Sequence, residues 1–325
     1  MKKVTIREVA KEAGVSVSAV SRVFNDYSDI GEETRKRVLK AAKDLDYFPN
    51  NAAKQLSSKR KRVIALILNE INVTPGVAMP LEILGGVIEE LDKTDYEFVF
   101  YAVNSKKQVQ KSLKQFCAER DITGLIIQGL RMDDPYYKEL ETLDVPTVAI
   151  DMEITHGNVG NVSTDNRRAV AEVTKRLFAA GKKEVLFVNG SQTAAVALAR
   201  EKGFKDILPE GKIAYANFSE EEAYELIMQC PNLEAYKVIF AASDLMAIGV
   251  IKALRMKNLI GQIDVIGFDD ITLASYISPA LTTVRQDISL FTKTAVKDLI
   301  RQIKTGKVSQ HFIPYEIVVR ESCQL

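Results

Sequence analysis

Seven short apolar runs, separated by longer amphipathic stretches, organise most of the chain after residue 62. Continuous apolar runs of this length are typical of strands buried on both faces, and the stretches between them have the spacing of helices. Such alternation predicts an α/β fold of parallel sheets covered by helices. The predicted strands are RVIALIL, YEFVFYAV, GLIIQG, PTVAID, EVLFVNG, YKVIFAAS and DVIGFDD, and the predicted helices cover residues 81–91, 107–119, 167–180, 194–207 and 246–257.

The number of these elements predicts two lobes rather than one. We expect the first lobe at about residues 63–160, together with the returning C-terminal segment. The second lobe is expected at about residues 161–287, so residues 63–325 form one core.

Charge is unevenly distributed along the 325 residues, although the formal net charge is only +1. Residues 1–62 carry 15 lysines and arginines against 8 acidic residues, whereas residues 63–325 carry 29 against 35. A basic N-terminal segment on an acidic body predicts that this segment alone binds a polyanion.

The apolar-run, cysteine and histidine content of the chain excludes several classes of protein. No run of about 18 apolar residues occurs, and no apolar segment follows Lys2 and Lys3, so we expect neither a membrane span nor a secretory signal. Three scattered cysteines favour a reducing cytoplasm, and His156 and His311 cannot complete a zinc site with them. Without a phosphate-binding loop or nucleophile elbow, we predict no enzyme, cofactor or metal.

Three short helices are predicted within residues 1–49. Thr5 and Glu8 have the spacing of a capping box, Gly14 suits the end of the first helix, and Ser16 can cap the second. A third helix is expected at about residues 32–45. The three helices together describe a helix-turn-helix domain. The expected buried positions are Ile6, Val9, Ala10, Ala13, Val20, Val23, Phe24, Val38, Leu39, Ala42 and Leu45.

The second helix of such a domain lies in the DNA major groove, with its N-terminal residues at the base edges. Arg22 could bind guanine O6 and N7 in a bidentate pair, and Val17 and Ser18 would help to select the operator sequence. Ser16, Ser21 and Asn25 suit phosphate oxygens. The alternative is an ordinary solvated helix face.

The stretch TIREVAKEAGVSVSAVSRVFN resembles the lactose/galactose repressor family of bacterial transcription regulators. The resemblance continues through ETRKRVLKAAKDLDYFPNNAAKQLSS, with one departure at Ala19, where the family commonly has threonine. It implies DNA contacts from Thr5, Ser16, Val17, Ser18, Ser21, Arg22, Asn25, Thr34, Tyr47, Asn50, Ala53 and Leu56.

The same resemblance implies a hinge helix at residues 50–57, within a hinge and linker segment at 50–62. Two such helices from a dimer would fold on the operator and enter its minor groove, with Leu56 as an apolar wedge. Composition alone leaves open the alternative of a flexible linker.

Polar residues follow several predicted strands of the core. Ligands of open parallel sheets bind outside the carboxyl ends of the strands, and converging carboxylates and amides suit a neutral, hydroxyl-rich ligand. Some of these residues have a structural alternative, because Ser243 or Asp244 could simply cap the helix that follows, and Asp270 could do the same after Gly267. The strand-end residues are Asn69, Glu70, Asp151, Asn189, Ser243, Asp244, Asp269 and Asp270.

The family resemblance extends through VSTDNRRAVAEVTKRLFAAGKKEVLFVNG, AREKGFKDIL, AASDLMAIGVIKAL, VIGFDD, PALTTVRQD and EIVVRES. It implies a fold like that of periplasmic sugar-binding proteins, with Arg200 and Asp269 as the main effector contacts. Ser243 departs from the asparagine of many relatives, and the loop at 70–80 is atypical. Because the chain has no tryptophan, ring stacking would come from a tyrosine or phenylalanine such as Phe268, Tyr276 or Phe291, or be absent. The predicted effector site is Asn69, Asp151, Asn189, Arg200, Ser243, Phe268 and Asp269.

The predicted function is a sequence-specific DNA-binding transcriptional regulator, a repressor of a carbohydrate-utilisation operon. Without leucine heptads after the last strand, we expect a homodimer on a pseudo-palindromic operator. We expect a sugar-like effector to shift the balance between two arrangements of the lobes. Control by a partner protein or a non-sugar metabolite is the alternative within the family. A sugar-binding protein or an enzyme is the alternative of another class.

Overall fold

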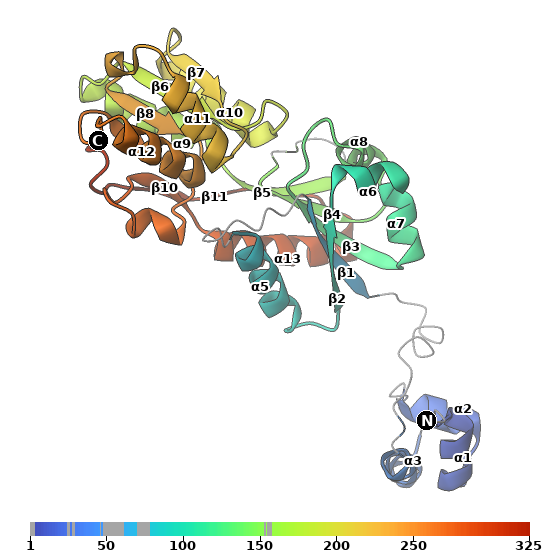
Figure 1. The fold of residues 1–325 in the computed structure, drawn as a ribbon. Coiled ribbons are helices and arrows are strands. Elements are labelled where there is room, and N and C mark those ends of the chain that lie inside the picture. Colours follow the sequence, from blue (N-terminus) through green and yellow to red (C-terminus); the bar gives the residue numbers. More distant parts are fainter. Residues whose placement is uncertain are drawn as a thin grey trace. The chain divides into compact units, whose positions relative to one another are not determined.

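The computed structural model describes residues 4–24, 27, 30–45, 47, 62–69, 79–152, 154 and 158–325. The chain divides into two compact units, Met1–Lys61 and Arg62–Leu325 (Figure 1). Several predicted positions lie outside the described residues: Asn25, Asn50, Ala53, Leu56, Glu70, His156 and most of the loop at 70–80.

The N-terminal unit contains α1 (Ile6–Ala13), α2 (Val17–Phe24) and α3 (Glu32–Asp44). The Thr5 backbone N–H donates to Glu8 Oε2 at 2.7 Å, and Gly14 ends α1 with a φ of 64°. One core prediction is wrong, because Leu39 is 49% exposed. Its position is one residue away from the buried face of α3, which Ala41 completes in its place.

The first lobe of the second unit is built on one six-stranded sheet with the order β11-β5-β4-β3-β1-β2. All five pairings in it are parallel. Helices α5 and α13 lie on one face of this sheet, and α7 and α8 lie on the other (Figure 1). Side chains of α5 and α13 form one core cluster with the sheet, and those of α7, α8 and η1 form the other. The elements are β1 (Val63–Asn69), α5 (Met79–Leu91), β2 (Glu97–Val103), α6 (Ser105–Gln110), α7 (Leu113–Glu119), β3 (Ile122–Gln128), α8 (Pro135–Glu139), η1 (Leu140–Thr142), β4 (Thr147–Ile150), β5 (Val159–Thr164), α13 (Ile288–Thr305) and β11 (Gln310–Ile313).

The second lobe contains a parallel sheet with the order β7-β6-β8-β9 and an antiparallel pair of β10 with β12. Its core includes Phe187, whose ring centroid lies 5.0 Å from that of Phe204 and 5.2 Å from that of Phe240. The elements are α9 (Asn166–Ala179), β6 (Val185–Asn189), α10 (Ala195–Ile207), β7 (Lys212–Tyr215), α11 (Glu220–Gln229), η2 (Leu233–Ala235), β8 (Val238–Ala241), α12 (Asp244–Met256), β9 (Asp264–Ile266), η3 (Thr272–Ser275), β10 (Thr283–Gln286) and β12 (Tyr315–Val318).

The chain passes between the lobes through three single-residue connections. Asp165 joins β5 to α9, Asp287 joins β10 to α13, and Pro314 joins β11 to β12. The first sheet therefore extends to Thr164, past the expected limit near residue 160. The C-terminal segment visits both lobes, since α13 and β11 pack in the first and Cys323 packs in the core of the second. The expectation that this segment returns to the first lobe therefore agrees with the structure for α13 and β11 but not for the residues near Cys323.

The predicted fold class is confirmed for the parallel α/β core and the N-terminal helical domain. No helix in the described ranges combines the length and the apolar character that a bilayer crossing requires.

Candidate functional site

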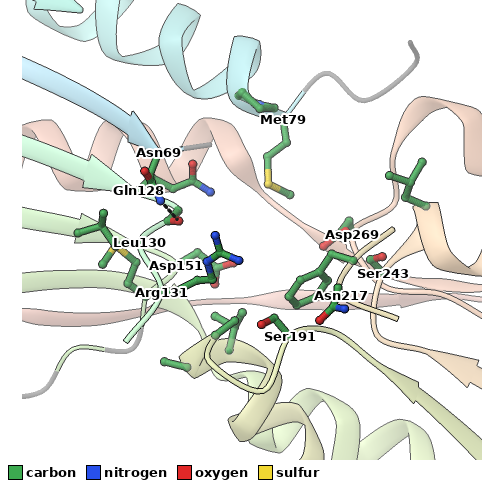
Figure 2. Close-up of a pocket in the computed structure, with 18 of the residues that line it drawn as sticks. Asn69, Met79, Gln128, Leu130, Arg131, Asp151, Ser191, Asn217, Ser243 and Asp269 are labelled. Atoms are coloured by element: carbon green, nitrogen blue, oxygen red, sulfur yellow. Dashed lines mark hydrogen bonds between the residues drawn. The ribbon is translucent and has the colours of Figure 1, made fainter. Parts of the chain in front are cut away.

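A cavity of about 360 Å³ lies between the two lobes of the second unit. Both lobes line it, largely with residues that follow the carboxyl ends of parallel strands, as the rule for open sheets predicts (Figure 2). The polar and aromatic lining residues are Asn69, Gln128, Arg131 and Asp151 from the first lobe, and Ser191, Arg200, Asn217, Phe218, Ser243 and Asp269 from the second.

The structure brings five of the seven predicted effector residues to this cavity. Asn189 and Phe268 are the two that do not line it, and both are buried. Within the described ranges, no group of three or more His, Cys, Asp or Glu side chains could hold a metal ion.

Arg200 projects from α10 and is almost fully buried. Its Nε donates to Asn166 Oδ1 at 2.8 Å, and its Nη1 donates to the carbonyl of Ala242. The guanidinium carbon lies 3.7 Å from the centroid of the Phe268 ring. These contacts fix the guanidinium plane, while Nη2 has no acceptor among the described residues and can donate to a ligand.

Asp269 follows β9 and adopts a backbone φ of 121°, which is a strained conformation for an aspartate. Its Oδ1 accepts a hydrogen bond from Gln286 Nε2 at 2.9 Å, and its backbone N–H donates to Val284 O at 2.8 Å. Burial raises the pKa of Asp269 to about 8, because a charged carboxylate loses hydration there. Arg200 opposes that rise in pKa, and the carboxylate of Asp151 adds to it.

Asp151 follows β4 and has a positive φ of 51°. Its Oδ1 accepts a hydrogen bond from Ser163 Oγ at 3.0 Å and a longer one from Asn166 Nδ2 at 3.4 Å. Asn166 therefore contacts Asp151 from the first lobe and Arg200 from the second, which couples the two charged groups of the site.

The two predicted asparagines hold loops that border the cavity. Asn69 Nδ2 donates to Gly129 O and to Asp134 Oδ2, and its Oδ1 accepts from Gln108. Asn189 donates to Ala197 O and Glu201, and it accepts from the N–H of Gly190. Their amides are occupied by protein partners, so their side chains act on the site through the loops.

The capping alternative holds for Ser243, whereas Asp244 and Asp270 have structural partners of another kind. Ser243 lines the cavity, but its Oγ also accepts from Met246 N at 3.3 Å and so caps α12. Asp244 is fully buried and accepts from Thr283 Oγ1 and Ile271 N. Asp270 forms ion pairs with Arg285 at 2.7 Å and Arg320 at 2.6 Å, and thus ties β10 to the C-terminal segment.

Among the described residues that line the cavity, Phe218 is the aromatic one, and the sequence did not indicate it. The expected stacking residues lie elsewhere. The ring of Phe268 packs against the guanidinium of Arg200, Tyr276 is 81% exposed, and Phe291 is buried in the first-lobe core. Phe218 follows β7, a half-exposed strand that lacks the apolar run of the other strands.

The predicted DNA-binding residues that are described cluster on and around α2. Ser16, Val17, Ser18 and Arg22 are exposed, and Ser21 is half-buried beside them. The Oγ of Ser16 accepts from Ala19 N at 3.1 Å and so caps this helix. Thr5 lies exposed before α1, Thr34 lies half-buried on α3, and the ring of Tyr47 packs 5.8 Å from that of Phe24.

Arg35 was not predicted from the sequence. Its guanidinium donates to Val23 O at 3.4 Å and to Tyr27 O at 3.0 Å. These bonds tie Val23 and Tyr27 to α3.

Two models of known protein families match this chain, one in each of its two units. The model for bacterial regulatory proteins of the lacI family matches residues 5–50, and the model for the periplasmic binding protein-like domain matches residues 174–323. The ribose operon repressor of Halalkalibacterium halodurans is 31% identical over 98% of this chain and 96% of that protein. The transcriptional regulator CelR of Thermobifida fusca is 28% identical over 98% of both chains.

Solved structures show the same fold. The lac repressor dimer bound to operator and the anti-inducer ONPF superposes with a TM-score of 0.83 at 24% identity, covering 99% of both chains. The CelR–cellobiose complex superposes with a TM-score of 0.72 at 25% identity, covering 99% of this chain and 100% of that one. The chain therefore belongs to the lacI family of bacterial regulatory proteins, which are DNA-binding transcriptional regulators and not enzymes.

Proposed function

We propose that the protein represses a carbohydrate-utilisation operon in the cytoplasm and that a sugar-like effector in the inter-lobe cavity controls its affinity for the operator. The observation that carries this proposal is the lining of the cavity. Carboxylates from both lobes, Asp151 and Asp269, surround it together with the fixed guanidinium of Arg200. The names of its relatives, which include repressors of ribose operons and a regulator complexed with cellobiose, support a carbohydrate.

The chemistry of the lining suits a ligand with several hydroxyl groups. A carboxylate accepts hydrogen bonds from hydroxyls, and Nη2 of Arg200 donates one in return. Phe218 supplies an apolar surface for the ring carbons of the ligand. The predicted contacts Asn69 and Ser243 border the same space. The amide of Asn69 is occupied by protein partners, whereas the Ser243 hydroxyl accepts from Met246 N and keeps its O–H to donate to a ligand.

The exposed face of α2 is proposed to read the operator. Arg22 would contact guanine in the major groove, and Val17 and Ser18 would meet neighbouring base edges. A homodimer places two such helices on a pseudo-palindrome. The hinge helix at residues 50–57, with Leu56 as its wedge, remains part of this proposal.

Control by the effector is proposed to follow from two lobe arrangements. The effector shifts their balance by the difference in its affinity for the two. That shift changes how the paired N-terminal domains meet the operator, and so couples the two sites.

Thermal melting of the full-length protein against D-ribose, cellobiose and further mono- and disaccharides tests the proposal. A ligand present at 100 times its Kd should stabilise the folded state by about 2.7 kcal/mol. Asp269→Asn should abolish the shift, whereas Asp133→Asn, at an exposed position outside the cavity, should preserve it. If no sugar stabilises the wild-type protein, the carbohydrate part of the proposal is wrong and a partner protein or another metabolite takes its place.

A further inference from the structure

Two loops that line the cavity from opposite lobes are joined by a backbone hydrogen bond. The N–H of Met132 donates to the carbonyl oxygen of Thr193 at 2.8 Å. Met132 lies in the first-lobe loop between β3 and α8, and Thr193 lies in the second-lobe loop between β6 and α10. This bond connects the lobes at a place remote in sequence from the three chain connections.

The first of these loops is held by a buried carboxylate. Asp134 is only 3% exposed and accepts hydrogen bonds from Arg131 N at 2.8 Å, Ser105 Oγ at 2.9 Å and Asn69 Nδ2 at 3.0 Å. Gly129 begins the loop with a φ of 86°, and a Cβ there would lie 2.9 Å from the carbonyl oxygen of Asn69. The Met132 N–H is therefore presented on a loop whose shape is set within the first lobe.

The second loop is held in the same manner from within the second lobe. Ser191 Oγ accepts from Thr193 N at 3.3 Å, and Ser191 O accepts from Ala194 N at 3.0 Å. Gly190 packs so closely on the ring of Phe218 that a Cβ would overlap it. The carbonyl of Thr193 is thus presented on a loop whose shape is set within the second lobe.

We propose that the Met132–Thr193 hydrogen bond is a latch that holds the lobes closed over the cavity, and that Asp134 is the residue that positions its donor. This inference rests on the proposed effector role of the cavity. Because each loop is held by hydrogen bonds within its own lobe, the bond between them should form with little further loss of chain entropy. Arg131 and Ser191 line the cavity and lie within two residues of the two bonded atoms, so an occupant that touches both stabilises the latched arrangement.

The decisive variant is Met132→Pro, compared with Met132→Ala. Asp134 N donates to Arg131 O at 3.0 Å, which places Met132 second in a four-residue turn. Proline is favoured at that position, so this substitution removes the N–H donor and retains the turn. Alanine removes the side chain and retains the donor.

The distance between the lobes is measured by double electron–electron resonance on the full-length protein without any sugar. Spin labels are attached through Lys138→Cys on α8 and Lys202→Cys on α10, both at exposed positions, in a Cys230→Ser background. Labelled protein is mixed with an excess of unlabelled protein, so that pairs between subunits do not contribute.

The wild-type protein and Met132→Ala should give mainly the short, closed distance. Met132→Pro should raise the ratio of open to closed molecules by about two- to tenfold, the range that corresponds to loss of one net hydrogen bond. Equal distributions for the proline and alanine variants, or a wild-type protein that is mainly open, would overturn the latch.

A second pair of variants tests the positioning role of Asp134. Asp134→Asn places an amide N–H₂ against backbone and side-chain donors and should release the loop. Asp133→Asn changes the neighbouring residue, which is exposed, and should leave the distance distribution unchanged. Identical distributions for the two asparagine variants would refute the role of Asp134. Since the measurement needs no effector, a failure of every sugar to bind would reject the proposed function and leave this result intact.

Discussion

Asn166 accepts a hydrogen bond on its Oδ1 from Arg200 Nε at 2.8 Å, although it is not itself part of the cavity lining. Asn166 is fully buried as the first residue of α9, directly after the connection at Asp165. Its Nδ2 also contacts Asp151 Oδ1 and Thr164 O at the end of the first lobe. The orientation of the guanidinium therefore depends on a residue at the junction of the lobes.

The first prediction is that Asn166→Ala weakens sugar binding without any direct loss of contact to the ligand. The buried Nε of Arg200 would lose its hydrogen-bond acceptor. A guanidinium that is no longer held in place loses more conformational freedom when it adopts the orientation that binds the ligand. The affinity for the sugar that stabilises the wild-type protein should fall about tenfold, which corresponds to about 1.4 kcal/mol. Calorimetric titration measures it. Asn158→Ala, at an exposed position, serves as the control, and equal affinities for the two variants would contradict the positioning role.

The second prediction concerns the pH dependence of effector binding. Asp269 has a pKa raised to about 8 by burial, so much of it is protonated at neutral pH. Sugar hydroxyls that donate to it favour the charged carboxylate, and binding should release a proton. Affinity should therefore increase as the pH rises from 6 to 8 and level off above that value. Calorimetry in two buffers of different ionisation enthalpy counts the released proton, and an affinity independent of pH in the wild-type protein would exclude this linkage.

The same raised pKa has an opposite effect on the stability of the unliganded protein. The folded state holds the proton of Asp269 more tightly than the unfolded chain does, where the carboxyl has its usual pKa of 3.8. The stabilisation that protonated Asp269 gives the folded state is therefore complete below about pH 4 and is lost as the pH rises towards 8. Asp269→Asn should remove this slope in the unliganded protein, and so separates Asp269 from other titrating groups.

Strand-end reasoning located much of the cavity for a physical reason. The carboxyl ends of parallel strands meet at one edge of each sheet, so the residues after β4 and β9 had to face the space between the lobes. Asp151 and Asp269 lie there as predicted from their places in the sequence. Arg200 was indicated by family resemblance, because nothing in the periodicity of α10 distinguishes it.

Other residues of the site could not be predicted by the same reasoning. A strand end fixes the position of a residue and leaves open which partners its side chain finds, so Asn189 became a support for the loop after β6. Phe218 was missed because β7 is an edge strand with half-exposed residues and no apolar run. Asp134 was missed because its importance arises from three donors that are far apart in the chain.

The third prediction is that Phe218→Ala lowers the affinity for the effector. Loss of the aromatic wall exposes ring carbons of the ligand and should cost about 1–2 kcal/mol, or roughly five- to thirtyfold in Kd. Phenylalanine and alanine both carry a Cβ, so the left-handed φ of 58° at this position disfavours them alike and the substitution should change backbone strain little. Tyr276→Ala removes an aromatic ring that is exposed and outside the cavity, and it should bind the effector like the wild-type protein. The reverse ranking in a titration would identify Tyr276 as the stacking residue.

The fourth prediction concerns operator recognition by α2. Arg22→Ala should remove about 1–3 kcal/mol of discrimination at one base pair, because a bidentate contact to guanine is lost. Binding to unrelated DNA should persist and should remain sensitive to salt, since phosphate contacts from other basic residues do not depend on sequence. Competition binding between a selected pseudo-palindromic fragment and random DNA measures the ratio of the two affinities. Lys43→Ala, at an exposed position on α3, is the control and should weaken both affinities equally or not at all. An Arg22→Ala protein that keeps the wild-type ratio of affinities would show that another residue reads the sequence.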